Sequence, residues 1–237
     1  MIFDQSEAAL RCEWGAHGVS QLAPASDVLI IVDVLSFSTA VDIAVSNGAH
    51  IFPYGQRDDL LEDYARARSA QIAEPVRTES GFSLSPASLR SIPAGCRLVL
   101  PTPNGGALSL AAAGAVTFTT CLRNARAVAR AARQLGDTFA VIPAGERWSD
   151  GSLRPAVEDW IGAGAVLAQL PGQPSPEAAL AIAAFEGAAR DCLAVLERSG
   201  SGKELMAHGF PEDVALAAAL DVSSAAPRLV DSAFLKT

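Results

Sequence analysis

Basic residues, clustered histidines and long apolar runs are scarce in this sequence, and each absence excludes a class of protein. The 237 residues include 18 Lys and Arg against 26 Asp and Glu, a formal net charge of -8. A nucleic-acid surface or an anionic membrane requires a basic footprint, so we expect neither as a partner. No window approaches the roughly 20 apolar residues of a membrane span, and the N-terminal segment has no apolar signal-peptide core. These features predict a cytoplasmic protein.

Cysteine is also too sparse to organise a site. Cys12, Cys96, Cys121 and Cys192 are far apart, form no C-x-x-C pair and have no histidine cluster nearby. Neither a structural zinc nor a disulfide framework is therefore predicted. An anionic substrate would have to be met by local positive charge or by a metal.

Apolar strand patterns and helical patterns alternate over the first two thirds of the chain. The predicted strands are 27–34, 49–53, 97–101, 115–120 and 138–143. The predicted helices are 38–45, 58–71, one after Asn104-Gly105-Gly106, 124–134 and 157–170. Residues 73–94 are rich in Ser and Pro and predict a long surface loop. The alternation predicts an α/β fold with a largely parallel or mixed sheet.

The last third is helical by composition. It predicts helices over 177–199, 203–208 and 212–220, and no internal repeat or low-complexity tract interrupts it. Half of the residues are hydrophobic, which is enough for a sizeable core. We therefore expect a single domain that spans residues 1–237.

Polar, loop-forming residues follow four of the predicted strands, and Asp33 is the most unusual of them. The carboxyl ends of parallel strands share one edge of an α/β sheet, where ligands bind, so these residues are expected to converge. Asp33 interrupts an apolar strand, where a carboxylate is costly unless it is paired, hydrogen-bonded or bound to a cation. Capping of the following helix is the alternative interpretation.

Asn104-Gly105-Gly106 stands between a strand and a helix. Free backbone amides at a helix N-terminus bind anions, which predicts a phosphate or sulfonate site, although these residues are also ordinary turn formers. The segment matches neither the P-loop nor G-x-G-x-x-G, so a nucleotide-binding enzyme is disfavoured.

Glu158 and Asp159 lie in the first turn of a helix that Pro155 helps to start. Adjacent helical residues point about 100 degrees apart, so one is expected to face a site while the other stabilises the helix start. Arg147 and Arg154 flank the same loop, and either could clamp an anion.

These motifs, in this order and spacing, resemble the 2-phosphosulfolactate phosphatase family. The similarity rests on Val32-Asp33-Val34-Leu35 with Ser38-Thr39, Thr102 to Leu108, Asn124-Ala125, Glu158-Asp159 with Ala163-Gly164, and the tail from His208. The resemblance implies a cytoplasmic, Mg²⁺-dependent hydrolase that cleaves the phosphate ester of 2-phosphosulfolactate on the route to coenzyme M. A small anionic phosphorylated substrate follows, and assembly into a homo-oligomer is compatible with it.

The resemblance also assigns roles to individual residues. The implied catalytic and metal-ligating carboxylates are Asp33, Glu158 and Asp159. The implied substrate-binding residues are Ser36, Asn104, Gly105, Gly106, Asn124, Arg147 and Arg154. Magnesium suits such a site because it takes one or two carboxylates and completes its shell with water and substrate phosphate. Either a water or a carboxylate could be the nucleophile.

The chain also departs from the family pattern. Ser36 stands where the family usually has Arg, Gly-Glu-Arg survives loosely at 73–77, and a motif containing Asp and Asn is reduced at 82–86. The loss of a charged hydrogen-bonding partner costs roughly 1.5–3 kcal/mol, enough to change a substrate or abolish turnover. The second hypothesis is therefore a catalytically weakened homologue that binds an anionic metabolite without hydrolysing it.

Overall fold

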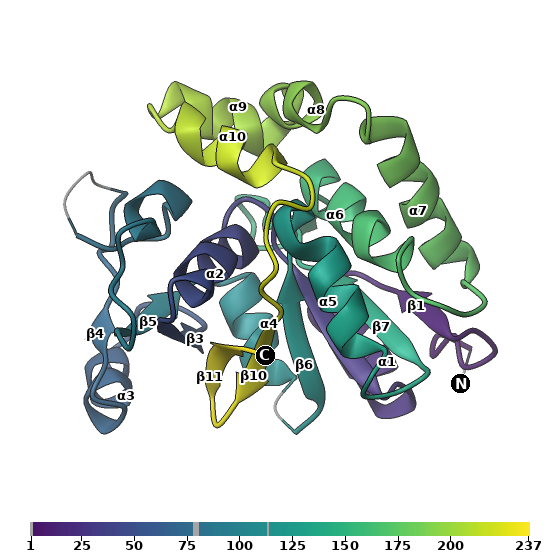
Figure 1. The fold of residues 1–237 in the computed structure, drawn as a ribbon, viewed down its shortest axis with the longest axis horizontal. Coiled ribbons are helices and arrows are strands. Elements are labelled where there is room, and N and C mark those ends of the chain that lie inside the picture. The colour runs from purple at the N-terminus through teal and green to yellow at the C-terminus, as the bar shows by residue number, and fades with distance from the viewer. Residues whose placement is uncertain (1, 78–80, 113) are drawn as a thin grey trace.

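The computed structural model describes residues 2–77, 81–112 and 114–237 and has an α/β fold around a nine-stranded mixed sheet (Figure 1). The strands are β1 (Leu10–Cys12), β2 (Val28–Val32), β3 (His50–Tyr54), β4 (Gln71–Ile72), β5 (Arg97–Pro101), β6 (Val116–Thr120), β7 (Phe139–Pro143), β8 (Glu146–Arg147), β9 (Leu153–Arg154), β10 (Pro227–Val230) and β11 (Ala233–Lys236). The helices are α1 (Gly15–Leu22), α2 (Phe37–Ser46), α3 (Leu61–Ala67), α4 (Gly105–Ala111), α5 (Ala125–Ala132), α6 (Val157–Leu167), α7 (Pro176–Ala188), α8 (Cys192–Arg198), α9 (Gly200–Ala207) and α10 (Pro211–Ala218).

The sheet consists of two parallel groups joined by an antiparallel hairpin. Its strand order is β1-β7-β2-β6-β10-β11-β3-β5-β4, while β8 and β9 pair separately. The β10-β11 hairpin pairs with β6 through Arg228 and Phe118, and with β3 through Phe234 and Ile51. The prediction of a mixed α/β sheet is thereby confirmed, although its antiparallel part comes from a C-terminal hairpin that the sequence patterns did not indicate.

The first parallel group contains β1, β7, β2 and β6, and the second contains β3, β5 and β4. The two groups run in opposite directions, because three antiparallel pairings, β6 with β10, β10 with β11 and β11 with β3, separate them. In a flat sheet the carboxyl ends of β2 and β5 would then lie at opposite edges. The amide of Gly105, after β5, nevertheless donates a hydrogen bond to Asp33, after β2, at 2.8 Å. The sheet is therefore not flat between these strands, and their ends meet.

β2 is covered on both faces, as its unbroken apolar sequence predicts. Val28, Ile30 and Val32 belong to a buried cluster with residues of α5, α6 and α7, whereas Leu29 and Ile31 pack with residues of α1 and α4. The end of β2 is consequently held in the interior, where Asp33 follows it.

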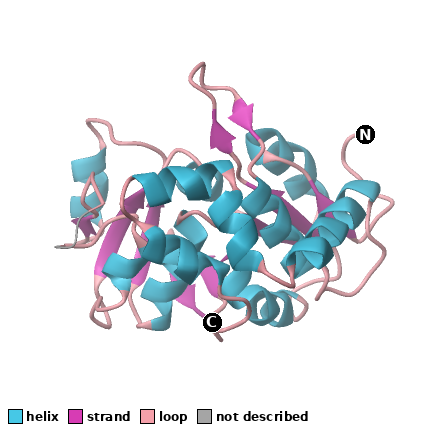
Figure 2. Ribbon diagram, turned by 90° about the horizontal axis from the view of Figure 1, so that it is seen from above, coloured by secondary structure: helices cyan, strands magenta, loops and turns pink. Residues whose placement is uncertain are grey.

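The C-terminal helices form an arch over the upper edge of the sheet. In Figure 1, α7, α8, α9 and α10 follow one another from the right of the molecule to a position above α2. Figure 2 looks down on this arch and shows helices over most of the strands. The described residues contain no helix with the length and apolar character that a membrane crossing needs.

Three predicted elements differ in the structure. The helix expected over 177–199 is two helices, α7 and α8, because the Asp191 side chain accepts a hydrogen bond from the Ala194 amide and caps a new helix. The helix expected over 58–71 is shorter, and Gln71 and Ile72 form β4 instead. Residues 73–94 form the expected loop, apart from a 3₁₀ turn at Pro86–Leu89; residues 78–80 of this prediction lie outside the described chain.

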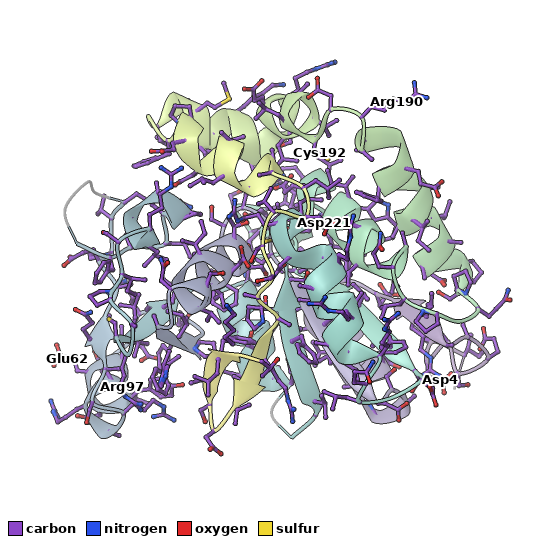
Figure 3. All side chains as sticks on the ribbon, viewed as in Figure 1. Asp4, Glu62, Arg97, Arg190, Cys192 and Asp221 are labelled. Carbon is purple, nitrogen blue, oxygen red and sulfur yellow. The ribbon has the colours of Figure 1, made fainter. Side chains whose placement is uncertain are left out.

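The N-terminus of α5 is capped by a distant residue. Asn124 stands at the expected N-cap position but makes no cap hydrogen bond there. The Asp221 carboxylate accepts from the Arg126 amide at 2.9 Å, and Figure 3 shows Asp221 between α10 and the start of α5. A carboxylate at this position is favourable because it faces the positive end of the helix.

We predict that Phe234→Ala destabilises the fold by about 3–5 kcal/mol. Phe234 is fully buried in the hairpin that joins the two halves of the sheet and contacts the Phe37 ring at 6.0 Å between centroids. Chemical denaturation measures the change, with Phe3→Ala as the matched control because Phe3 is 72% exposed. Equal effects of the two substitutions would contradict a structural role for the hairpin.

Candidate active site

Asp33 is held at the end of β2 by backbone amides from two segments. Its Oδ1 accepts from the Phe37 amide at 3.2 Å and its Oδ2 from the Gly105 amide at 2.8 Å. The pKa of Asp33 is raised to about 6. Burial is the main cause and the charge of Glu158 adds to it, while the two hydrogen bonds act in the opposite direction. Each oxygen retains a second lone pair, so the side chain can accept one more contact on each.

Asp159 ties the ends of two neighbouring strands together. Its Oδ1 accepts from the Val34 amide at 2.7 Å and its Oδ2 from the Gly145 amide at 2.8 Å. Burial, together with the charges of Asp33 and Glu158, raises the pKa of Asp159 well above its usual value. Both oxygens thus accept hydrogen bonds from the backbone after β2 and β7, so Asp159 has a structural role in holding these two segments together.

Glu158, which precedes Asp159 in α6, is a buried carboxylate without a hydrogen-bond donor among the described residues. It is 1% exposed, and neither of its carboxylate oxygens has a hydrogen-bond partner among the residues that the structure describes. An isolated carboxylate is costly in such a place, and unsatisfied groups of this kind mark missing ions or waters. Of the two acidic residues at the start of α6, Glu158 is therefore the one available to a ligand.

Arg77 brings a positive charge to this acidic region from the long loop. Its guanidinium pairs with Asp213 of α10 at 2.6 Å and donates to the Ser36 hydroxyl at 2.9 Å. Asp213 is itself held by the Ser85 hydroxyl at 2.7 Å and the Ala87 amide at 3.1 Å. This buried ion pair fixes the guanidinium beside the end of β2.

Glu146, three residues after β7, is the third carboxyl of this region with a raised pKa. Burial and the charge of Asp33 raise the pKa of Glu146 to about 7, while a hydrogen bond from Asn104 acts in the opposite direction. The Asn104 Nδ2 donates to the Glu146 Oε2 at 2.8 Å. A carboxyl with a pKa near neutral can both release and accept a proton under physiological conditions.

Asp33, Arg77 and Glu146 line a cavity of about 330 Å³ beneath α9, whereas Glu158 and Asp159 lie behind its wall and are not among its lining residues. Its polar lining consists of Asp33, Ser36, Arg77, Thr102, Asn104, Glu146, Ser201, Glu204 and His208. The cavity unites the ends of β2, β5 and β7 with the long loop and the C-terminal helices. A small molecule of this size would meet an acidic wall and one fixed arginine.

The described residues contain no group of three or more His, Cys, Asp or Glu side chains arranged to hold a metal ion. The unpartnered oxygens of Glu158 and the remaining lone pairs of Asp33 still offer two carboxylates, and the charge of Glu158 is felt at Asp33. Magnesium is commonly held by one or two carboxylates, with waters and substrate phosphate as its other ligands. The donor set therefore fits a small, hard cation.

The two glycines after Asn104 serve the packing of the site. The Gly105 amide is engaged by Asp33, and a Cβ on Gly105 would lie 2.5 Å from the Phe37 ring. A Cβ on Gly106 would lie 2.3 Å from the Tyr54 carbonyl oxygen. Only glycine fits at these two positions, which form the first turn of α4.

The remaining predicted substrate residues lie off this cavity. Asn124 is buried after β6, where its Oδ1 accepts from the Cys121 amide at 2.9 Å. Arg147 is exposed and lines a neighbouring cavity. Arg154 donates to the Ser201 hydroxyl at 3.0 Å and so holds a residue that does line it.

Several cavity residues were not among those predicted. Glu146 lies in the polar segment that follows β7, three residues after that strand ends, so the polar character of this segment was the available signal. Arg77 lies in a loop without periodicity, and only the loosely matched family segment at 73–77 pointed to it. Ser201, Glu204 and His208 come from the C-terminal helices, whose sequence carries no sign of their position over the sheet.

Comparison with known proteins gives a consistent result. Residues 17–232 match the model of the family described as 2-phosphosulpholactate phosphatase. The chain is 31% identical over 216 residues to a probable 2-phosphosulfolactate phosphatase of Gloeobacter violaceus, covering 85% of this chain and 88% of that protein. It is 29% identical over 190 residues to the 2-phosphosulfolactate phosphatase of Methanothermobacter thermautotrophicus, covering 80% of each.

We predict opposite effects for the same chemical change at two adjacent residues. Asp159→Asn should destabilise the protein by about 1–3 kcal/mol, because an amide nitrogen would face a backbone N–H at Val34 or Gly145. Glu158→Gln should leave stability unchanged or raise it, since it removes a buried charge without a partner. Denaturant unfolding of both variants measures this, and equal losses would contradict the assigned environments.

We also predict that the ligand-free protein loses stability as the pH rises from 5 to 8. The pKa values of Asp33 and Glu146 are about 6 and about 7 in the folded state, above their usual values of 3.8 and 4.5, so folding takes up protons. The stability that these two carboxyls contribute is fully present below their pKa values in the unfolded state. It is lost as the pH rises through about 6 and about 7, their pKa values in the folded state. The melting temperature should fall by a few degrees.

Glu146→Gln should flatten that fall between pH 6 and 8, whereas Glu62→Gln, at an exposed position, should not. An unchanged slope in the Glu146 variant would show that this carboxyl does not titrate with folding.

Proposed function

Because the chain belongs to the 2-phosphosulfolactate phosphatase family, we propose that it hydrolyses a small acidic phosphate monoester in a Mg²⁺-dependent reaction. The family places it among the phosphoric monoester hydrolases. The proposed substrate is 2-phosphosulfolactate or a related phosphorylated hydroxy acid. The observation that carries this proposal is the meeting of Asp33 and Arg77 in one cavity, with the unpartnered Glu158 nearby.

Asp33 and Glu158 are the residues that would hold Mg²⁺. Bound there, the ion would neutralise phosphate charge and lower the pKa of a coordinated water. Its charge would also offset the repulsion between the two carboxylates, which would otherwise oppose the approach of an anionic substrate. Asp159 keeps the backbone around this pair in place.

Arg77 is proposed to bind the phosphoryl oxygens. A guanidinium forms paired, charge-assisted hydrogen bonds with phosphate, and its worth is greatest where water is excluded. Its side chain is 16% exposed, and Asp213 and Ser36 fix its orientation before the substrate arrives. The residue thus supplies positive charge in advance of the reaction.

Glu146 is proposed to hold the proton that the leaving oxygen needs. Its pKa of about 7 leaves a large protonated fraction at neutral pH, and its position on the cavity wall faces the same space as Asp33 and Arg77. The Asn104 amide orients the carboxyl through one oxygen. Proton donation of this kind contributes roughly 10²–10⁴-fold to a rate.

One observation favours the second candidate function, binding of an anionic metabolite without turnover. The Gly105 amide, proposed from the sequence as a phosphate donor, is already engaged by Asp33. Arg77 would then be the main anion contact in a site that lacks part of its electrostatic stabilisation.

A phosphate-release assay with Mg²⁺ over a panel of phosphorylated hydroxy acids tests the proposal. We expect turnover of at least one substrate, a loss of roughly 10–100-fold or more in kcat/KM for Glu158→Gln, and weaker Mg²⁺ binding by calorimetry in that variant. Arg77→Lys should raise KM because it keeps the charge but loses the planar fork. Glu62→Gln is the matched control.

Silence across the panel from folded, Mg²⁺-supplied protein would contradict the phosphatase proposal. Tight binding of a panel member without product would then support the second candidate. Unaltered Mg²⁺ binding in Glu158→Gln would remove this residue from the proposed ion site.

A further inference from the structure

A second and larger cavity of about 460 Å³ adjoins the first. It lies beside α1 and α4, and its apolar lining consists of Trp14, Pro103, Ala107, Leu108, Ala111, Ala144 and Leu153. Small-molecule sites are usually of this size, with apolar walls and a few polar groups. Its polar contributions come from His17 and Arg147, together with the Asn104 and Glu146 side chains.

The two cavities share a wall. Pro103, Asn104 and Glu146 line both of them, and the Asn104–Glu146 hydrogen bond of 2.8 Å lies in that wall. A molecule held beside Asp33 and Arg77 would therefore contact the same residues as a molecule in the larger cavity. This continuity distinguishes the larger cavity from an unrelated surface hollow.

The larger cavity is also built from fixed parts. The Trp14 ring stacks on Trp160 with 5.2 Å between centroids and 11° between planes. Leu108 is 6% exposed and belongs to the buried cluster between α1 and the sheet. Leu153 closes over Gly145, where a Cβ would lie 2.7 Å from the Leu153 Cδ1.

We propose that this cavity is a subsite for the apolar part of the substrate, so that the preferred substrate is a phosphorylated 2-hydroxy acid with an apolar side group. The inference rests on the proposed function. The phosphate lies beside Asp33 and Arg77, and the side group extends past the Asn104–Glu146 pair, which lines both cavities, toward Ala107 and Ala111. A three-carbon acid bound beside Asp33 is too short to contact these apolar walls. A phenyl or branched alkyl group would reach them, and its removal from water would favour binding.

The test compares 2-phospholactate with 2-phospho-3-phenyllactate, which differ only in the side group. We expect kcat/KM for the phenyl substrate to be at least roughly tenfold higher, because even one methylene in an apolar pocket changes this ratio by about 10–200-fold. Ala111→Phe, at an exposed position lining the cavity, should bring the ratio close to one. Ala179→Phe, at an exposed position on α7, is the matched control and should preserve it.

Binding of the unphosphorylated acids separates this inference from the phosphatase proposal. By calorimetry, 3-phenyllactate should bind the whole protein roughly tenfold more tightly than lactate, and Ala111→Phe should remove the difference. This preference in a protein without phosphatase activity would sustain the subsite and overturn the proposed reaction. Turnover of both substrates without a preference, or equal binding of the two acids, would overturn the subsite. Thermal unfolding of each variant shows that the fold is intact.

Discussion

The accumulation of buried acid at one edge of the sheet is the constraint on which the rest of the site depends. Asp33, Glu146, Glu158 and Asp159 meet around the end of β2, and the charges of the first three each raise the pKa of at least one other carboxyl in the group. Amide hydrogen bonds stabilise Asp33 and Asp159, and Asn104 serves Glu146. Glu158 has no such partner. A site of this kind binds protons or a cation, and it meets a phosphate ester only when its negative charge is offset.

The positive side of the site depends on segments far apart in the chain. Arg77 reaches the cavity from the long loop and is fixed by Asp213 of α10, so loop and C-terminal helices depend on each other. Ser36, which follows β2, accepts a hydrogen bond from this guanidinium. A cation therefore stands beside the end of β2 although no arginine follows it directly in the sequence.

Local patterns were sufficient wherever the environment of a residue follows from its neighbours. The unbroken apolar run of β2 indicated a strand covered on both faces. The patterns failed where a distant contact decided. One of the adjacent carboxylates of α6 was expected to stabilise the helix start, but Asp159 instead accepts hydrogen bonds from amides after β2 and β7. Asp191 divides a segment that is helical by composition throughout, and Asp221 rather than Asn124 caps α5.

The sequence by itself determined the α/β class, the five longer strands between residues 27 and 143, and the helices that follow them, because periodicity is local; it did not indicate β1, α1, β4, β8 or β9. It also singled out Asp33, because the cost of burying charge is local. The sequence led us to expect that the residues after β2 and β5 converge, as at the shared edge of a parallel sheet, but only the tertiary structure shows how they do so. The two strand groups run in opposite directions across the hairpin, so Gly105 and Asp33 do not meet along one parallel edge. The positions of Arg77 and of the residues from α9 were decided in the same way, since packing across the molecule leaves no periodic trace in the chain.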